Sequence, residues 1–234
     1  MPAPTAQRNF TDPESRIMRD GATKSFVQGY NAQAAVDSQH QVIVATGVTQ
    51  AAGDVQQLVP MLERVHANTG QWPAVGTADA GYFSEANVTA EALQSIELYI
   101  PPDKQSHGRS IGSIGSIGSI GSISSISSIS SISSISSTSG TSGTSGTSGT
   151  APGATAASLE RTRMREKLQT PEGQAEYRRR KGIVEPVFGQ IKERRGFRRF
   201  SVRGLAKVSA EWDLICATHN LLKLFRAGAR LTPA

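Results

Sequence analysis

Four side chains in residues 176–196 have types and spacing that could do chemistry. Tyr177, Lys181, Glu185 and Lys192 supply a phenol, two ammonium groups and one carboxylate. At about 100° per residue, they fall near 0°, 40°, 80° and 60° around a helix axis. A carboxylate ringed by bases suits a divalent metal that must meet a phosphate backbone. This stripe is the first candidate site.

An apolar arc adjoins the stripe on the same helix, from about 240° through 0° to about 20°. Its members are Ile183, Val184, Val187, Phe188 and Ile191. We therefore expect one flank to pack and the other to present Glu185. A second interpretation stays open, because charges at i, i+4 spacing ordinarily form a solvated face with weak ion pairs. Pro186 crowds the carbonyl of Gly182, which predicts a kink beside Glu185.

The elements before residue 110 alternate between strand and helix patterns. YNAQAAVDS and the β-branched VIVATGVT flank SQHQ, which predicts a hairpin. Residues 54–70 have helical spacing, with Asp54 as N-cap and Gly70 as stop. PAVGTADAGY predicts a buried strand ending at Asp79, followed by a helix over SEANVTAEALQSI capped by Ser84 and a strand at ELYIPP. Strand, helix, strand implies a parallel pair.

Residues 110–150 contain only Ser, Ile, Gly and Thr, repeated every three residues. A period of three matches neither a strand nor a helix, and this composition does not repay the entropy of ordering. We expect a disordered insertion whose removal leaves any activity intact. A repetitive adhesive or a stacked solenoid is the alternative, although Ser and Ile do not supply the turns that a triplet solenoid needs.

Beyond the repeats, the chain is basic and helical. Thr170, followed by Pro171 and Glu172, should cap the helix that carries Glu185. The loop GFRRFSVRG places Arg198 and Arg199 beside aromatic residues, and we expect both arginines, like Lys181, to bind DNA. The pattern over 205–226 predicts a last amphipathic helix that closes the core, in which Trp212 packs rather than stacks on a ligand.

The charge is unevenly distributed along the 234 residues. Residues 159–234 carry 18 basic and 8 acidic residues, net +10, whereas residues 1–158 carry 7 and 11, net −4, which together give the overall +6. This asymmetry favours a polyanion, with nucleic acid ahead of a membrane. The single cysteine, Cys216, excludes an internal disulfide and reads as a core thiol. With no signal-like or membrane-length apolar run, we expect a soluble, cytoplasmic, nucleoid-associated protein.

The order hairpin, helix, strand, helix, strand and late helix is that of an α/β, RNase H-like mixed sheet with flanking helices. Asp79 and Glu185 would then converge at one edge of the sheet, where two carboxylates can begin a Mg²⁺ site. Each acid also has a simpler interpretation: Asp37 as the end of a strand at a turn, Asp54 as a helix cap, and Asp79 as the start of an Asp-Ala-Gly turn. The four histidines share no metal-ligand spacing.

At this point the chain resembles the DDE transposases of bacterial insertion sequences, in the subgroup with a Tyr-Arg-Glu-Lys signature. The resemblance is carried by DPESRIM, QGYNAQAAVD, ADAGYFSE, RRRKGIVEPVFGQIKERRGFRRF and EWDLICATHNLLKLF. It implies Asp79 as the second catalytic Asp and Glu185 as the third acid, both binding Mg²⁺ or Mn²⁺. It also implies Tyr177 and Lys192 as DNA contacts. In the signature's Arg position we prefer Lys181 to Arg180, because Lys181 lies on the proper face.

The resemblance implies DNA partners, both transposon ends and target, and a second copy of the chain is a further partner to consider. One departure is important: the first catalytic Asp belongs on a strand before the hairpin, and Asp12, Asp20 and Asp37 are not convincing substitutes. The chain therefore looks like the C-terminal portion of a transposase, and we expect little or no cleavage by it alone. A non-catalytic DNA-binding remnant or regulator, and a pseudogene product that barely folds, are the alternatives.

These patterns divide the chain into four segments. We expect an irregular N-terminal segment at 1–29, the first part of the catalytic domain at 30–109, the low-complexity insertion at 110–156 and a basic helical part at 157–234.

Overall fold

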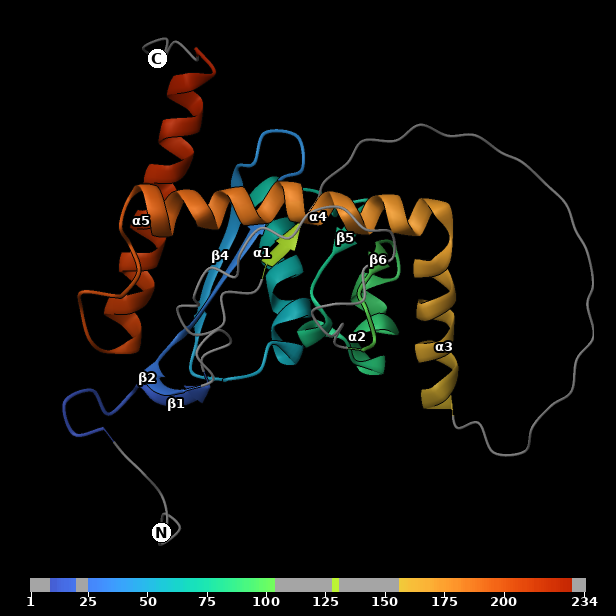
Figure 1. Ribbon diagram of the computed structural model, residues 1–234, viewed down its shortest axis with the longest axis horizontal. Helices are drawn as coiled ribbons and strands as arrows, with labels where there is room; N and C mark the ends of the chain where they lie inside the picture. The colour runs from blue at the N-terminus through green and yellow to red at the C-terminus, as the bar shows by residue number, and fades with distance from the viewer. Residues whose placement is uncertain (1–8, 20–24, 104–127, 131–155, 229–234) are drawn as a thin grey trace, which may run out of the picture.

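The computed structural model describes residues 9–19, 25–103, 128–130 and 156–228 (Figure 1). A five-stranded sheet lies at the centre, with strand order β4-β3-β7-β5-β6. The strands are β3 (Asn31–Val36), β4 (Ile43–Thr49), β5 (Val75–Thr77), β6 (Glu97–Tyr99) and β7 (Ser128–Ser130). The α-helices are α1 (Leu58–Thr69), α2 (Glu85–Val88), α3 (Ala156–Gln169), α4 (Pro171–Gly189) and α5 (Leu205–Arg226). The described part is therefore an α/β structure, as predicted.

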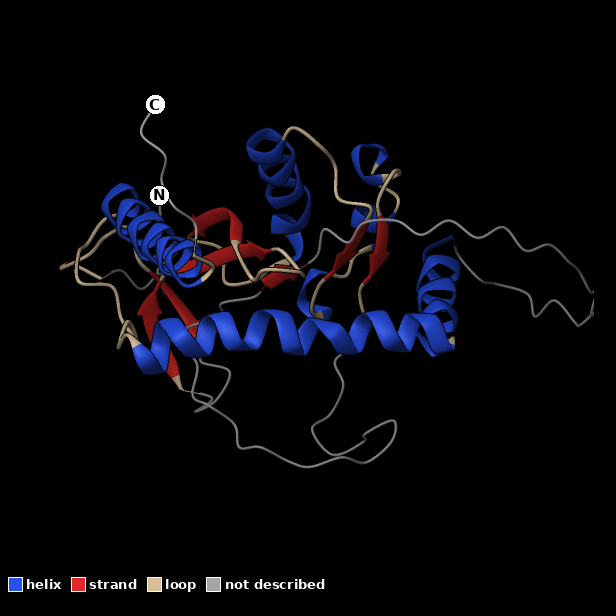
Figure 2. Ribbon diagram, turned by 90° about the horizontal axis from the view of Figure 1, so that it is seen from above, coloured by secondary structure: helices blue, strands red, loops and turns tan. Residues whose placement is uncertain are grey.

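Helices cover both faces of this sheet. Seen from above, α4 runs along one side of the strands and α1 and α2 lie on the other (Figure 2). One core gathers α1, η2 (Ala80–Tyr82) and Met164 of α3 against one face. The other packs α4 and α5 on Ala32, Ala34, Val36 and Ile43. Alternate residues of β3 thus serve two cores, which is why all six of its residues are buried.

The predicted hairpin and parallel pair are both confirmed. β3 and β4 are antiparallel, with Asn31 opposite Thr49 and Val36 opposite Ile43. β5 and β6 are parallel, with Thr77 opposite Tyr99. The predicted core role of Trp212 is confirmed as well, because it is buried and its indole Nε1 donates to the Gln33 carbonyl at 2.8 Å.

Several predicted helix ends are also confirmed. Thr170 accepts from the Gly173 amide at 3.0 Å, and Ser84 accepts from the Asn87 amide at 3.1 Å. Gly70 ends α1 with a left-handed φ of 75°. The single helix expected over 84–96 is wrong, because the chain forms the short α2 and then a 3₁₀ turn, η3 (Glu91–Leu93).

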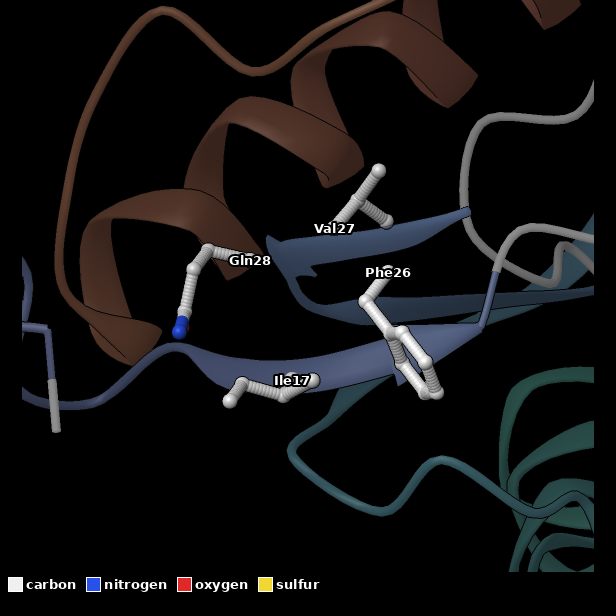
Figure 3. Close-up of a pocket in the computed structure, with 4 residues that line it drawn as sticks. All are labelled: Ile17, Phe26, Val27 and Gln28. Carbon is white, nitrogen blue, oxygen red and sulfur yellow. The ribbon is translucent and has the colours of Figure 1, made fainter. Parts of the chain in front are cut away.

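The expectation of an irregular N-terminal segment through residue 29 is wrong. β1 (Arg16–Arg19) and β2 (Phe26–Gly29) form an antiparallel two-stranded sheet of their own. Backbone pairing between the two segments sets this hairpin, and their mixed composition gave no period-2 signal. A shallow pocket of about 430 Å³ on these strands is lined by Ile17, Phe26, Val27 and Gln28 (Figure 3). None of these four described residues has a titratable side chain.

A strand from the repeat tract sits in the middle of the sheet. β7 is parallel to β3, pairing Ala34 with Ser128, and antiparallel to β5, pairing Thr77 with Ser130. The expectation of a wholly disordered insertion is therefore wrong at these three residues, where strand edges on both sides offer backbone partners. Residues 110–127 and 131–155 lie outside the described residues.

α4 continues through Pro186 as one helix and then widens into the π-helix η4 (Gln190–Arg194). The Gly182 carbonyl, which loses its helical donor to Pro186, instead accepts a hydrogen bond from Gln41 Nε2 at 2.8 Å. Gln41 lies in the β3–β4 turn with a left-handed φ of 57°. The turn thus supplies the bond that the proline removes.

Candidate functional site

Asp79 lies where β5 ends and the η2 turn begins. Its backbone carbonyl accepts from the Tyr82 amide at 3.0 Å, so the predicted Asp-Ala-Gly turn is confirmed. The side chain caps no helix and is 44% exposed. A strand end places the carboxylate at the edge of the sheet, open to solvent on one side.

Arg180 of α4 reaches Asp79 from the opposite side. Its Nη2 lies 2.9 Å from Asp79 Oδ1, while the Arg180 side chain is only 10% exposed. Its guanidinium carbon also lies 5.4 Å from the centre of the Tyr177 ring. The Nε of Arg180 is buried and has no hydrogen-bond partner within the part of the chain that the structure describes. One polar corner therefore holds a carboxylate, a guanidinium and a phenol.

The half-buried Tyr177 belongs to this corner electrostatically. Burial raises the pKa of its phenol, the Asp79 carboxylate adds to the increase, and the nearby Arg180 charge opposes it. The phenol therefore stays protonated at neutral pH and can donate a hydrogen bond.

Sequence reasoning passed over Arg180, although a signal was present. On the angular scale used above it falls near 300°, in the middle of the apolar arc. The structure buries it there, one turn before Ile183 and Val184. A charged residue inside an apolar arc needs a partner of opposite charge, and Asp79 is that partner. Lys181, one position on, is exposed and makes no hydrogen bond or ion pair with another described residue.

Glu185 lies further along α4 than the arginine that pairs with Asp79. Glu185 is exposed and has no hydrogen-bond or ion-pair partner among the described residues. It follows Arg180 by five residues, which is about 7.5 Å along the axis and about 140° around it. The predicted packing of the neighbouring arc is confirmed, because Ile183, Val184, Val187, Phe188 and Ile191 are all buried.

Carboxylates are the right ligand type for Mg²⁺ or Mn²⁺, and Asp79 and Glu185 are the two predicted to bind the metal. No group of three or more His, Cys, Asp or Glu side chains gathers anywhere in the described ranges. The Asp79 carboxylate is also already neutralised by Arg180. Of the two predicted metal ligands, Asp79 is therefore paired with a cation, and Glu185 is exposed with no ion-pair partner among the described residues.

The basic side chains of this region divide by their contacts. Lys192 Nζ lies 5.8 Å from the centre of the Phe188 ring, and Arg198 forms an ion pair with Glu193. Arg199 is exposed and makes no ion pair or hydrogen bond with another described residue. Arg195 is structural, because its Nη1 donates to the Ile215 carbonyl at 2.9 Å.

The remaining titratable residues behave structurally. Asp37 closes the β3–β4 turn by accepting from the His40 amide at 2.7 Å, as its simpler interpretation predicted. Burial strongly raises the pKa of the Cys216 thiol, which identifies it as the predicted core residue. His219 is fully buried and its Nε2 lies 3.1 Å from the Gln41 carbonyl oxygen.

Asp54 departs from its predicted role. It precedes the 3₁₀ turn η1 (Val55–Gln57), but its side chain makes no cap hydrogen bond. The carboxylate points instead to the amide side chains of Asn31 and Gln33 on β3. Asp54 thus occupies the predicted N-cap position, but its side chain does not cap the turn, because the buried amides bind its carboxylate.

Comparison with known proteins supports the resemblance in the C-terminal part. Residues 150–225 match a family model described as "Transposase DDE domain". The matched segment contains Glu185 and all five residues predicted to bind DNA, and Asp79 precedes it. No curated protein and no solved structure matches the chain. The predicted relation to the C-terminal portion of a DDE-class transposase is thereby confirmed, and DNA is the partner that such a domain implies.

No helix among the described residues is long and apolar enough to span a membrane.

Proposed function

We propose that this chain acts in the transposition of a bacterial insertion sequence, as an RNase H-like DDE domain that binds transposon ends and target DNA. In the arrangement described, cleavage by the chain alone is weak or absent. The observation that carries this is the Asp79–Arg180 ion pair, in which one of the two proposed metal ligands is already bound by a cation. Asp79 and Glu185 are the acids that would hold Mg²⁺ or Mn²⁺ in an assembled site.

The element order supports the RNase H-like assignment. A hairpin, a helix and the strand that ends at Asp79 precede the parallel strand β6, and α4 packs across β5 and β6. This packing of α4 on β5 and β6 supports a site to which both Asp79 and Glu185 contribute.

The charge distribution supports binding to DNA. The matched segment lies within the part of the chain with net charge +10, and Lys181 and Arg199 are exposed there. Unneutralised cations release counterions when they meet phosphates, so affinity should fall steeply with salt. Tyr177, Lys192 and Arg198 complete the predicted DNA surface.

A nicking assay tests this function. The purified chain is incubated with supercoiled plasmid and Mg²⁺ or Mn²⁺, beside Asp79→Ala, Glu185→Ala and, as a matched control, Asp37→Ala. We expect little or no nicking by the wild type, and no difference between it and the three variants. Robust nicking that disappears in both acid variants would show that the acids assemble on DNA. That result would contradict the weak-activity part of the proposal.

The alternative is a non-catalytic DNA-binding remnant or regulator of a transposase, which the unpaired Arg199 favours. Its test is DNA affinity against salt concentration for the wild type and Arg199→Glu. We expect the slope of log affinity against log salt to fall by about one unit or more in the variant. Arg163→Glu is the control, because Arg163 is already paired with Glu160. Salt-independent affinity would reject both DNA-binding functions.

A further inference from the structure

Two buried amide side chains on β3 converge on a single carboxylate oxygen. Asn31 and Gln33 are 0% and 1% exposed. Asn31 Nδ2 donates to Asp54 Oδ1 at 2.7 Å, and Gln33 Nε2 donates to the same oxygen at 3.0 Å. A third bond joins the two amides, from Gln33 Nε2 to Asn31 Oδ1 at 2.8 Å. Because unpaired amides are costly inside a protein, these bonds hold the Asp54 side chain in one orientation.

The other Asp54 oxygen rests against the turn that begins at Asp79. A Cβ atom at Gly81 would lie 3.0 Å from Asp54 Oδ2, so the backbone of the turn and the carboxylate are in close approach. Gly81 has no positive φ, so its lack of a side chain is explained by this approach rather than by its backbone angle.

Gln33 also holds the far end of the turn, together with Asn87. The hydroxyl of Tyr82, whose side chain is fully buried, donates to Gln33 Oε1. The Tyr82 carbonyl in turn accepts from Asn87 Nδ2 at 2.7 Å. The turn that starts at Asp79 is thus restrained at Gly81 by Asp54 and at Tyr82 by Gln33 and Asn87.

We propose that Asp54 is a positioning residue for Asp79, acting through the β3 amides and the η2 turn. The inference deepens the proposed function and rests on it, because orientation of Asp79 matters only if that carboxylate serves the DNA reaction. Satisfied buried polar networks are rigid, and here rigidity fixes where the Asp79 side chain leaves the sheet and meets Arg180.

The test uses two readouts that need neither DNA nor metal. The first is hydrogen exchange of the Tyr82 amide, which is bonded to the Asp79 carbonyl. The second is the NMR signal of the buried Arg180 Nε–H, which reports the pairing with Asp79. In Asp54→Ala we expect Tyr82 exchange at least about tenfold faster, equivalent to about 1.4 kcal/mol of local opening, and a weakened Arg180 signal. Amides of α5 should be unaffected.

Three further variants separate positioning from general damage. Asp54→Asn keeps an oxygen for both amide donors and should restore exchange to within about threefold of wild type. Gly81→Ala should speed exchange of the turn, and much less so when combined with Asp54→Ala, because the obstructing oxygen is gone. Asp37→Ala removes a carboxylate from the other end of β3 and should leave both readouts unchanged.

The inference is overturned if Asp54→Ala matches Asp37→Ala in both readouts, if exchange rises equally in α5, or if the Gly81 and Asp54 effects simply add. Should Asp54→Ala not fold, Asp54→Asn and Gly81→Ala still decide the matter. A chain that passes this test but never nicks DNA keeps the role of Asp54 and loses the cleavage function. A chain that nicks DNA but fails here loses only this inference.

Discussion

Arg180 and Asp79 form an ion pair whose two partners differ in exposure: the arginine side chain is 10% exposed and the aspartate side chain 44%. Loss of the ion pair should therefore cost more free energy when Arg180 is left unpaired than when Asp79 is left unpaired. Burial of a guanidinium is tolerated when a carboxylate compensates it, whereas an exposed carboxylate keeps water as an alternative partner. This pair links the end of β5 to the centre of α4.

We expect Asp79→Ala to destabilise the protein by about 1–2 kcal/mol, because it strands the buried guanidinium. This is below the ~3–5 kcal/mol of a fully buried pair, since the Asp79 side chain is partly solvated. Arg180→Met should cost less, because an apolar chain of similar length suits the arc. Urea unfolding of both variants measures this, with Arg179→Ala, from an exposed pair with Glu176, as control. The reverse order of costs would contradict the assigned dependence.

The bond from Gln41 to the Gly182 carbonyl should be coupled to Pro186. We expect Gln41→Ala to cost about 1–2 kcal/mol, because the carbonyl then lacks both its helical and its side-chain donor. In Pro186→Ala, where the helical N–H returns, the same substitution should cost less. A double-mutant cycle by chemical denaturation gives the coupling. Strictly additive effects would mean that Gln41 does not compensate for the proline.

Trp212 should contribute to stability and not to DNA affinity. Trp212→Phe removes the hydrogen bond to the Gln33 carbonyl and part of a side chain packed beside Phe188 and Phe200, so we expect a loss of about 2–3 kcal/mol. DNA affinity at a temperature where the variant is folded should change less than about twofold. Trp72→Phe, at a half-buried position, is the control. A large affinity loss with unchanged stability would reveal a stacking role.

Stability should fall as the pH drops below about 6.5. Burial lowers the pKa of His219 from its usual value of 6.5, with smaller contributions from the cations Lys223 and Arg195. Folded His219 is therefore neutral, and its stabilising effect is complete above pH 6.5. Below that pH the unfolded chain binds a proton that the folded chain does not, so unfolding becomes easier.

His219→Gln, which keeps a donor for the Gln41 carbonyl, should remove this pH dependence. Between pH 7.5 and 5.5 the wild type should lose about 1 kcal/mol more than the variant, as measured by denaturant titration. Glu97 and Glu211, whose carboxyl pKa values are lowered below 4.5, do not titrate in this window. Equal pH slopes for the two proteins would show that His219 is not held neutral.

The local features of the fold were predictable from the sequence, because each depends on neighbouring residues. Apolar spacing indicated α4 and α5, a β-branched run and a turn indicated the hairpin, and Thr170 and Ser84 marked helix starts by their own side chains. The resemblance of residues 150–225 to a transposase domain was also predictable, because the motif that carries it is continuous along the chain.

Contacts between distant segments were not predictable in this way. The strand Ser128–Ser130 is positioned by backbone pairing with β3 and β5, which lie about 50 to 90 residues earlier in the chain. Local spacing predicted that the Asp54 side chain caps a helix. In the structure, its Oδ1 instead accepts hydrogen bonds from two amides that lie 21 and 23 residues earlier in the chain. These groups meet only because the sheet is formed, and no local sequence pattern indicates which distant residues will be in contact.

The sequence by itself therefore determined which residues form the apolar arc of α4 and which acids stand near it, because a helix has a fixed angular period. Only the tertiary structure decided which acid meets which base. Asp79 pairs with Arg180, and Glu185 is exposed to solvent. The reason is that the guanidinium of Arg180 is buried inside the apolar arc and requires a carboxylate to compensate its charge.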